Sequence, residues 1–311
     1  MRRYSIALAV SLLFSISAQC TDIENNSDTL TIVFTGDILL DRGVRKVISQ
    51  HGVGHLFSDG VDSVLRSAQI VVGNLECPAT KIEAPVQKRF IFRAEPEWLD
   101  TLRQHGITHL NLANNHAIDQ GRKGLMDTRQ NIIQAGMTPI GAGKTMREAS
   151  EPVLLAEHPR KVWMLASLRL ALENYAYLTD KPCVSQEPMD SLVRRVSRLR
   201  QADSTSVIIV SLHWGGEHTL KPVPRQRLEA QRLILAGADA LICHHTHTLQ
   251  TIETFQGKTI HYSIGNFIFD QPQPLNSKAC MVRLLITKDS LSTETIPIDI
   301  LRCVPYVYEG Q

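Results

Sequence analysis

The sequence predicts a mixed α/β protein. Runs rich in Val, Ile and Leu alternate along the chain with longer amphipathic segments, an order typical of strands joined by helices. The chain has 311 residues, of which 43% are hydrophobic and 21% are charged, so it is able to bury a substantial core. Because no repeat, low-complexity tract or linker interrupts residues 30–311, we expect them to form a single domain.

The first half of that domain shows both kinds of element. Apolar runs without regular alternation indicate strands that are covered on both faces. Apolar residues three or four positions apart indicate helices. The expected strands are 30–35, 69–72 and 109–113. The expected helices are 59–67, 95–104 and 121–135, of which the last two are followed by a glycine that ends them.

The second half continues the alternation. A Gln-Gly-Lys turn at 256–258 predicts a hairpin, and the alternating tail from 281 to 300 predicts mostly strand. Residues 170–188 form the least regular part of the chain. The expected strands are 153–156, 162–166, 207–212, 240–243, 252–255 and 259–264. The expected helices are 189–200 and 225–236.

The N-terminus has the pattern of a secretory signal. A basic start is followed by an apolar run at 6–16 and by small residues before Cys20. This apolar run is too short to span a bilayer, and the small residues resemble a bacterial lipobox. We therefore expect a signal peptide over 1–20, lipidation at Cys20 and a polar tether over 21–29. The protein would then be an exported, membrane-anchored lipoprotein, facing the periplasm or the cell surface.

The charge balance argues against a nucleic-acid partner. The chain has 33 Lys and Arg against 31 Asp and Glu, a formal charge of +2. Arg2 and Arg3 lie in the expected signal peptide, and their removal leaves the remaining chain with a charge of 0. No excess of positive charge is therefore left for binding a phosphate backbone.

The cysteines are predicted to pack in the core rather than to bind a structural metal. Five follow Cys20, an odd number, and none shows the Cys-x-x-Cys spacing of a structural zinc site. We expect each to be a small buried residue. They are Cys77, Cys183, Cys243, Cys280 and Cys303.

Metal-ligating residue types follow the predicted strands. In sheets of this class, ligand sites gather beyond the carboxyl ends of the strands. Carboxylates, an amide oxygen and imidazoles together suit Mn, Fe or Zn, and six such side chains are more than one tetrahedral ion needs. Two metals that share a carboxylate are able to bind a phosphoryl group and activate water. The six candidate ligands are Asp37, Glu76, Asn115, His213, His245 and His247, and His116 directly follows Asn115.

These residues lie in five of six motifs that together resemble the CapA family. This family comprises bacterial capsule (poly-γ-glutamate) synthesis proteins within the calcineurin-like metallophosphoesterase superfamily. The resemblance runs from about residue 31 to about residue 270 and implies a four-layer α/β/β/α sandwich with a dinuclear metal centre. The motifs are GDILL at 36–40, GNLE at 73–76, NLANNHAID at 111–119, HWGGE at 213–217, HHTH at 244–247 and SIGNF at 263–267.

The resemblance also implies a role for each residue. Glu76 resembles the carboxylate that bridges the metals, and His116 the catalytic histidine that stabilises the transition state or protonates the leaving group. Asp119 and Glu217 are candidates for orienting His116 and a ligand, and ordinary surface pairing is the alternative for both. The residues that resemble the remaining metal ligands are Asp37, Asn115, His213, His245 and His247.

Some positions depart from the general phosphoesterase pattern. Leu39 occupies the position at which general phosphoesterases carry a metal-binding histidine in the first motif. One ligand is therefore absent, and we expect the centre to hold either two metals or only one. Glu76 replaces an Asp. We expect His244 to be a spectator, either packed in the core or exposed. Trp214 is expected to pack beside the site.

Two functions are consistent with these motifs. The first is an exported metal-dependent hydrolase-like protein of capsule synthesis, in which a metal-bound hydroxide attacks a phosphoester or a γ-glutamyl amide. The alternative is a non-catalytic, metal-containing accessory subunit of a membrane-bound polymer synthase. His116 favours the enzyme, because a structural site has no use for an acid–base group, whereas Leu39 keeps the accessory role open. A third hypothesis is a carbohydrate- or peptide-binding module, in which Asp37→Ala and His247→Ala leave function intact.

Overall fold

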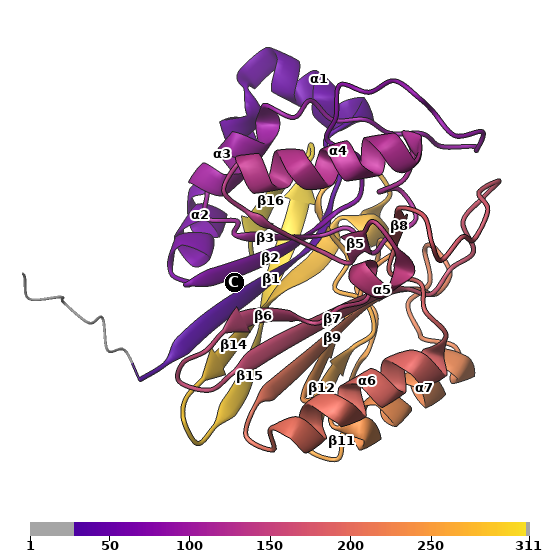
Figure 1. The fold of residues 1–311 in the computed structure, drawn as a ribbon. Coiled ribbons are helices and arrows are strands. Elements are labelled where there is room, and N and C mark those ends of the chain that lie inside the picture. Colours follow the sequence, from indigo (N-terminus) through magenta and orange to yellow (C-terminus); the bar gives the residue numbers. More distant parts are fainter. Residues whose placement is uncertain (1–27, 309–311) are drawn as a thin grey trace, which may run out of the picture.

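A computed structural model describes residues 28–308 of the chain (Figure 1). The expected signal peptide, Cys20 and most of the expected tether lie outside these residues. Within 28–308, no helix has both the length and the apolar character needed to cross a membrane. The expected mixed α/β class is confirmed, because strands and helices alternate through most of the described chain.

The larger sheet contains eight strands of the described chain. Its order is β16-β15-β14-β1-β2-β3-β4, and β13 also pairs with β1. Strands β1 to β4 run parallel, and β14 to β16 form an antiparallel extension beside β1. The strands are β1 (Leu30–Ile38), β2 (Ile70–Leu75), β3 (His109–Asn111), β4 (Thr138–Ile140), β13 (Asn266–Ile268), β14 (Lys278–Ile286), β15 (Leu291–Leu301) and β16 (Val304–Val307).

The smaller sheet contains six strands of the described chain in the order β11-β12-β10-β9-β7-β6. Its central strands β7, β9, β10 and β12 are parallel, and β6 and β11 are antiparallel edges. The strands are β6 (Val153–Ala156), β7 (Val162–Leu168), β9 (Val207–His213), β10 (Ala240–Ile242), β11 (Ile252–Phe255) and β12 (Lys258–His261). A separate short pair joins β5 (Ala142–Gly143) and β8 (Cys183–Val184).

Helices lie on either side of the two sheets (Figure 1). Four of them, together with a 3₁₀ turn, pack with the larger sheet, and α6 packs beside α7 against the smaller one. The helices are α1 (Arg42–His51), η1 (Val53–Leu56), α2 (Asp59–Arg66), α3 (Trp98–Gln104), α4 (Gly121–Gln134), α5 (Met146–Ala149), α6 (Met189–Ala202), α7 (Pro224–Ala236) and η2 (Pro274–Asn276).

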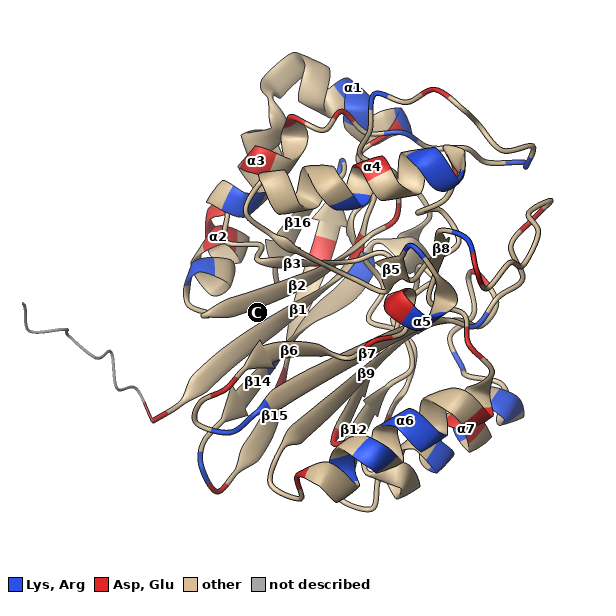
Figure 2. Cartoon of the chain, in the orientation of Figure 1, with Lys and Arg blue, Asp and Glu red and all other residues tan. Residues whose placement is uncertain are grey.

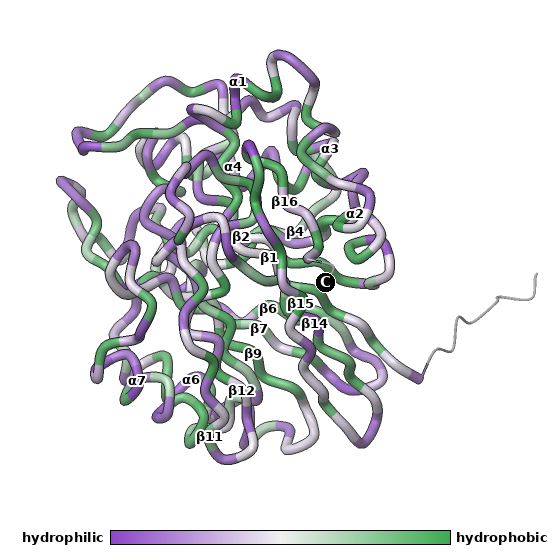
Figure 3. Tube along the Cα trace, turned by 180° about the vertical axis from the view of Figure 1, so that it is seen from behind, coloured by the Kyte–Doolittle hydropathy of each residue, from purple (hydrophilic) through white to green (hydrophobic). Residues whose placement is uncertain are grey.

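The core explains why the strands are continuous apolar runs. Successive side chains of a strand point to opposite faces of its sheet. In β1, Ile32 and Phe34 belong to one apolar cluster with Ile209 of β9, whereas Val33 belongs to another with Leu125 of α4. Both faces of the strand are therefore buried, and Figure 3 shows hydrophobic residues along both sheets.

Most of the predicted elements are confirmed, with shifts at their ends. The strand expected at 109–113 ends at Asn111, and the tail is divided into β14 and β15. Helix α1 and strand β4 were not predicted. The five cysteines of the described chain are buried, as expected, and all five are free.

Candidate metal centre

The candidate ligands meet where the carboxyl ends of both sheets adjoin. Asp37 lies near the end of β1, Glu76 directly follows β2, and His213 ends β9. His245 and His247 follow β10 in a loop where both have positive φ values, 98° and 58°, which are unfavourable for residues other than glycine. All five side chains are buried.

These side chains form two groups that share one carboxylate. Asp37, Glu76 and His247 form the first group, and Glu76, His213 and His245 form the second, with the ligand atoms of each group within 4.8 Å of one another. Oε1 of Glu76 lies 3.7 Å from Nε2 of His213 and 3.9 Å from Nε2 of His247. Glu76 is therefore placed to contact an ion in either group.

Asn115 adds an amide oxygen to the second group. Its Oδ1 lies 2.8 Å from Nε2 of His213, which in turn lies 3.1 Å from Nδ1 of His245. The turn that carries Asn115 is fixed by Asn114, whose Oδ1 accepts hydrogen bonds from the backbone N–H groups of His116 and Ala117. The second group thus offers a carboxylate, an amide and two imidazoles, a donor set suited to a divalent transition metal.

The hydrogen bonding of the carboxylates also fits a metal. Both oxygens of Glu76 and Oδ2 of Asp37 are buried without a hydrogen-bond partner in the described chain. Buried carboxylates are normally paired or coordinate a metal, because leaving them unpaired is costly. The residues therefore fit one or two divalent ions.

The two carboxylates differ in their electrostatic surroundings. Burial by itself would raise the pKa of Asp37, but the imidazoles of His244 and His247, whose Nδ1 atoms each lie 3.3 Å from one of its oxygens, hold this pKa well below its usual value. Burial and the nearby charge of Asp37 raise the pKa of Glu76 well above its usual value. A bound cation would reverse the effect on Glu76, so metal uptake is coupled to loss of a proton.

The pKa values of the three imidazoles are also shifted in different directions. Burial lowers the pKa of His213 well below its usual value and lowers that of His245 to about 3. Burial also opposes the charged form of His247, but the charges of Glu76 and Asp37 raise its pKa to about 9. His213 and His245 are thus held in the neutral form that binds metals.

His116 lies beside the second group and faces a cavity. Its Nδ1 lies 2.8 Å from Oδ2 of Asp119, which is fully buried, and its ring packs 4.3 Å from that of Phe92. Among the described residues, Nε2 of His116 has no hydrogen-bond partner. Residues including His116, His247, Arg42 and Phe92 line a cavity of about 110 Å³. The free nitrogen is therefore available to a group bound in this cavity.

Of the two residues proposed to orient others, Asp119 contacts His116. Glu217 lines the cavity with its side chain 47% exposed, and its Oε2 lies 3.8 Å from Nε2 of His218. This exposed position beside His218 agrees with the alternative stated for Glu217, an ordinary pair of side chains on the surface. Trp214 is buried in the core, and its Nε1 donates to the carbonyl of Tyr262.

His244 is packed in the core, one of the two positions expected for it, but it also contacts a candidate ligand. It is buried, and its Nδ1 lies 3.3 Å from Oδ1 of Asp37, which also accepts a hydrogen bond from Asn74. Asn74 and His244 thus lie next to one oxygen of Asp37, and the other oxygen lies 3.3 Å from Nδ1 of His247. His244 is therefore in contact with a candidate ligand and is no spectator.

Lys88 is a residue of this site that the sequence did not indicate. Its side chain is only 4% exposed, and its Nζ lies 2.7 Å from Oδ1 of Asp119 and 3.0 Å from the carbonyl oxygen of Asn115. The same Nζ lies 3.3 Å from Nδ1 of His116, so Lys88 and Asp119 together fix this side of the imidazole ring. The irregular segment that carries Lys88 gives no pattern to separate it from its exposed neighbour Arg89.

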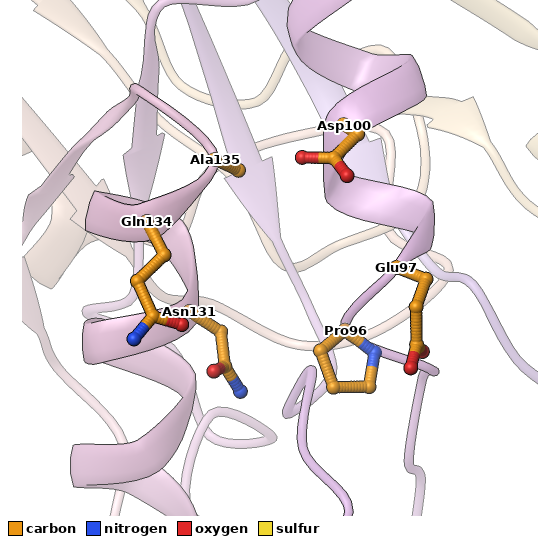
Figure 4. A pocket seen from close by; sticks show the side chains of 6 residues that line it. All are labelled: Pro96, Glu97, Asp100, Asn131, Gln134 and Ala135. Atoms are coloured by element: carbon orange, nitrogen blue, oxygen red, sulfur yellow. The ribbon is translucent and has the colours of Figure 1, made fainter.

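Another cavity of the described chain lies away from the candidate metal ligands. A cavity of about 370 Å³ lies between α3 and α4, where Glu97 and Asp100 face Asn131 and Gln134 (Figure 4). It contains none of the candidate metal ligands. The cavity beside His116 is therefore the one that belongs to the candidate centre.

Comparison with known sequences shows the family. Residues 31–271 match the family described as "Bacterial capsule synthesis protein PGA_cap", and the chain belongs to this family. It is 30% identical over 284 residues to the PGA biosynthesis protein CapA of Bacillus subtilis (strain 168), a match that covers 90% of this chain and 74% of the relative. The resemblance to CapA is thereby confirmed.

Two further relatives carry related names. The capsule biosynthesis protein CapA of Bacillus anthracis is 28% identical over 306 residues, covering 94% of this chain and 74% of its own. A probable polyglutamine synthesis accessory protein of Mycobacterium tuberculosis is 27% identical over 292 residues, covering 79% of this chain and 76% of its own.

Solved structures support the fold alone. A hypothetical protein from Thermus thermophilus superposes with a TM-score of 0.50 at 12% identity, over 86% of this chain and 99% of that one. The sulfate thiohydrolase SoxB of the same organism gives a TM-score of 0.52 at 11% identity, over 86% of this chain and 56% of that one.

Proposed function

We propose that the protein is a metal-dependent hydrolase-like protein of capsule (poly-γ-glutamate) synthesis, with a four-layer α/β/β/α fold of the calcineurin-like metallophosphoesterase type. The observation that carries the proposal is the pair of buried ligand groups that share Glu76 beside His116. The family and the names of its relatives support the process. Three apolar clusters, between the sheets and under the helices on each side, support the layer order.

The residues of the site have distinct chemical roles in this proposal. Two bound divalent metals would supply a Lewis acid and an activated water for attack on a phosphoester or a γ-glutamyl amide. Asp37, Asn115 and the three imidazoles would hold the ions, and Glu76 is placed to contact both of them. Asp119 accepts from Nδ1–H of His116 and fixes its ring, so that Nε2 of a charged His116 would donate a proton to a leaving group in the cavity. Burial lowers the pKa of His116, which makes this proton easier to release.

His116→Ala tests the catalytic part of the proposal. The assay follows hydrolysis of a generic phosphodiester and of a γ-glutamyl oligomer by the full chain, with metal content measured on the same samples. We expect turnover to fall by about 10²- to 10⁴-fold while the metal stays bound. His51→Ala, an exposed histidine at the end of α1, is the matched control. Unchanged turnover in His116→Ala would refute the catalytic role.

A non-catalytic accessory subunit of a membrane-bound polymer synthase is the second candidate. Leu39 at the place of a usual ligand favours it, as does the word "accessory" in the name of the Mycobacterium tuberculosis relative. Polymer formation in cells separates the two functions. An accessory subunit needs Asp37 and tolerates His116→Ala, whereas an enzyme needs both residues.

We also propose that the protein is exported and anchored through a lipid on Cys20. The basic start, the apolar run and the small residues before Cys20 support this. In cells given labelled fatty acid, we expect label in the wild-type protein and none in Cys20→Ala. Release of the variant from the membrane fraction is the second readout, and a variant that stays membrane-bound would contradict the anchor.

A further inference from the structure

The cavity beside His116 has one arginine in its lining. Figure 2 shows Lys and Arg mainly on the helices and connecting segments that surround the sheets. One of them, Arg42 at the start of α1, lines this cavity together with His116 and His247. The cavity volume of about 110 Å³ is roughly that of three or four water molecules. Because the cavity is so small, a group bound in it lies close to the proposed proton donor and to a candidate metal ligand.

Two aromatic rings hold the guanidinium of Arg42 near both histidines. Its Cζ lies 5.1 Å from the centre of the Phe92 ring and 5.5 Å from that of the Phe269 ring. The Phe92 ring lies 4.3 Å from the ring of His116, and the Phe269 ring lies 4.7 Å from the ring of His247. Each histidine therefore contacts a ring that also contacts the guanidinium, and these cation–π contacts restrict the movement of the arginine.

An ion pair fixes the guanidinium without using all of its donors. Nη2 of Arg42 donates to Oδ1 of Asp270, whose Oδ2 accepts the backbone N–H of Gly43 at 2.8 Å. Arg42 lines the cavity and Asp270 does not. Among the described residues, Nε and Nη1 of Arg42 have no hydrogen-bond partner, and the side chain is 35% exposed. The guanidinium is thus held in place with donors still open to a ligand.

The backbone of Arg42 has an unusual conformation. Its φ is 51°, in the left-handed region that favours glycine. The turn is held by Asp41, whose carboxylate accepts the backbone N–H groups of Arg42 and Arg93, both at 2.8 Å. Strained residues of this kind persist where their neighbours fix them, and they concentrate at binding and catalytic sites. The conformation thus agrees with a role of the Arg42 side chain in binding.

An amide group of the same cavity adds a second donor. Oδ1 of Asn266 lies 2.9 Å from Nδ1 of His247, and Nδ2 of Asn266 donates to Oε1 of Gln271 at 3.1 Å. Gln271 lines the cavity, and its Nε2 has no hydrogen-bond partner among the described residues. The one carboxylate in the lining, that of Glu217, is 47% exposed and lies beside His218. A guanidinium and an amide N–H together suit a carboxylate, which offers two acceptor oxygens.

We propose that Arg42 and Gln271 form a subsite for the α-carboxylate of the glutamyl unit that leaves when a γ-glutamyl amide is cleaved. The assignment rests on the proposed function and names the substrate feature that the site would recognise. In a γ-linked chain, the nitrogen released by cleavage and the α-carboxylate of the same unit are bonded to one carbon atom. A nitrogen that faces Nε2 of His116 therefore brings this carboxylate into the same small cavity. The subsite would select an acidic leaving unit over a neutral one.

Binding of a γ-glutamyl oligomer to the full chain, measured by calorimetry, tests the subsite. Arg42→Asn removes the guanidinium and introduces a residue that tolerates the left-handed conformation. We expect it to weaken binding by about tenfold or more, and Arg42→Lys, which keeps the charge without the planar fork, to weaken it less. An oligomer whose α-carboxylates are amidated should bind weakly, and equally to the wild type and to Arg42→Asn.

Two further variants control for charge. Arg42→Asn leaves Asp270 without its ion pair, and this carboxylate would repel an anion by itself. The double variant with Arg42→Asn and Asp270→Asn removes both charges and should still bind the oligomer about tenfold more weakly than the wild type, whereas wild-type affinity would overturn the subsite. Lys46→Asn, at an exposed basic residue of α1, should bind as the wild type does. The melting temperature of each variant shows whether it is folded.

The outcomes separate the subsite from the proposed function. Arg42-dependent binding without turnover would support the subsite and count against the hydrolase. Binding and turnover that are unchanged in Arg42→Asn would overturn the subsite and leave the hydrolase standing. A generic phosphodiester has no carboxylate on its leaving group, so equal losses of phosphodiester and oligomer turnover in Arg42→Asn would overturn the carboxylate assignment. Absence of oligomer binding by the wild type would overturn it too.

Discussion

Glu76 is the residue on which both candidate metal groups depend. Its carboxylate is shared by the two groups, is fully buried and has no hydrogen-bond partner in the described chain. Without a cation, burial and the nearby charge of Asp37 oppose the ionised form of Glu76 and raise its pKa. The same side chain should therefore weaken the metal-free fold and strengthen the metal-bound one.

Glu76→Gln should weaken metal binding and raise the stability of the metal-free protein. Loss of the shared carboxylate lowers the metal content of the purified protein, as measured by mass spectrometry. Replacing this carboxyl by a neutral amide removes the cost of burying its ionised form, which raises the free energy of unfolding of the metal-free protein at pH 7 by about 1 kcal/mol. Glu97→Gln, an exposed carboxylate beside Lys81, should change neither property. If Glu76→Gln keeps the full metal content, Glu76 is not the bridging ligand.

Lys88 supports a second prediction at this scale. Its ammonium group compensates the buried charge of Asp119, so Lys88→Met leaves that charge unpaired. We expect a loss of about 3 kcal/mol in the free energy of unfolding, measured by denaturant titration. Lys81→Met removes an ion pair with a largely exposed lysine and should have little effect. Equal effects of the two substitutions would show that the Lys88 contact adds no stability.

At the scale of the element, Gly36 allows two strands to approach each other. A Cβ atom at Gly36 would lie 2.2 Å from the carbonyl oxygen of Gly265 and 2.7 Å from the carbonyl carbon of Asn266. The backbone N–H of Asp37 donates to that same Gly265 oxygen, and Asn266 contacts His247 through its Oδ1. Gly36 therefore lets β13 pair with β1 at the place where Asp37 enters the site.

Gly36→Ala should separate these strands. We expect a loss of about 3 kcal/mol in the free energy of unfolding, because backbone atoms cannot move aside as the end of a side chain can. Metal content should fall with it, because Asp37 and His247 are displaced. Gly60→Ala, on helix α2 with its nearest neighbour at 3.6 Å, should be neutral or slightly stabilising. A stable, metal-loaded Gly36→Ala protein would contradict this account of the motif.

The elements also show what the sequence was able to predict. Strands such as β1 and β9 are buried on both faces, so their composition indicates them directly, and the polar residues that follow them were recognisable as site candidates. Strand β4 has only three residues, one of them a proline, and carries no such signal. Helix α1 buries only Val44 and Ile48, too few for its spacing to be evident. Lys88 is positioned by tertiary contacts alone.

At the scale of the whole molecule, stability should depend on pH through buried histidines. Burial lowers the pKa of His261 on β12 to about 4, against an ordinary value of 6.5. The unfolded chain takes up a proton below 6.5 while the folded chain does so only near 4. The contribution of His261 to stability is therefore complete above pH 6.5 and is lost progressively as the pH falls from 6.5 to 4.

His261→Gln isolates this contribution. Between pH 7 and pH 5, the metal-free wild type should lose about 2 kcal/mol more of its free energy of unfolding than the variant does. Denaturant titrations of both proteins at the two pH values measure the difference, and other titrating groups contribute equally to both. Parallel losses in the two proteins would mean that His261 is not held neutral in the fold.

The central claim is that two metal ions share Glu76 where the carboxyl ends of the two sheets meet. Anomalous diffraction at the Mn, Fe and Zn edges, from crystals of the purified protein, tests it most directly. We predict two peaks about 3.5–4 Å apart. One should be bound by Asp37, Glu76 and His247, and the other by Glu76, His213 and His245. A single peak, no peak, or peaks that do not contact Glu76 would contradict the claim.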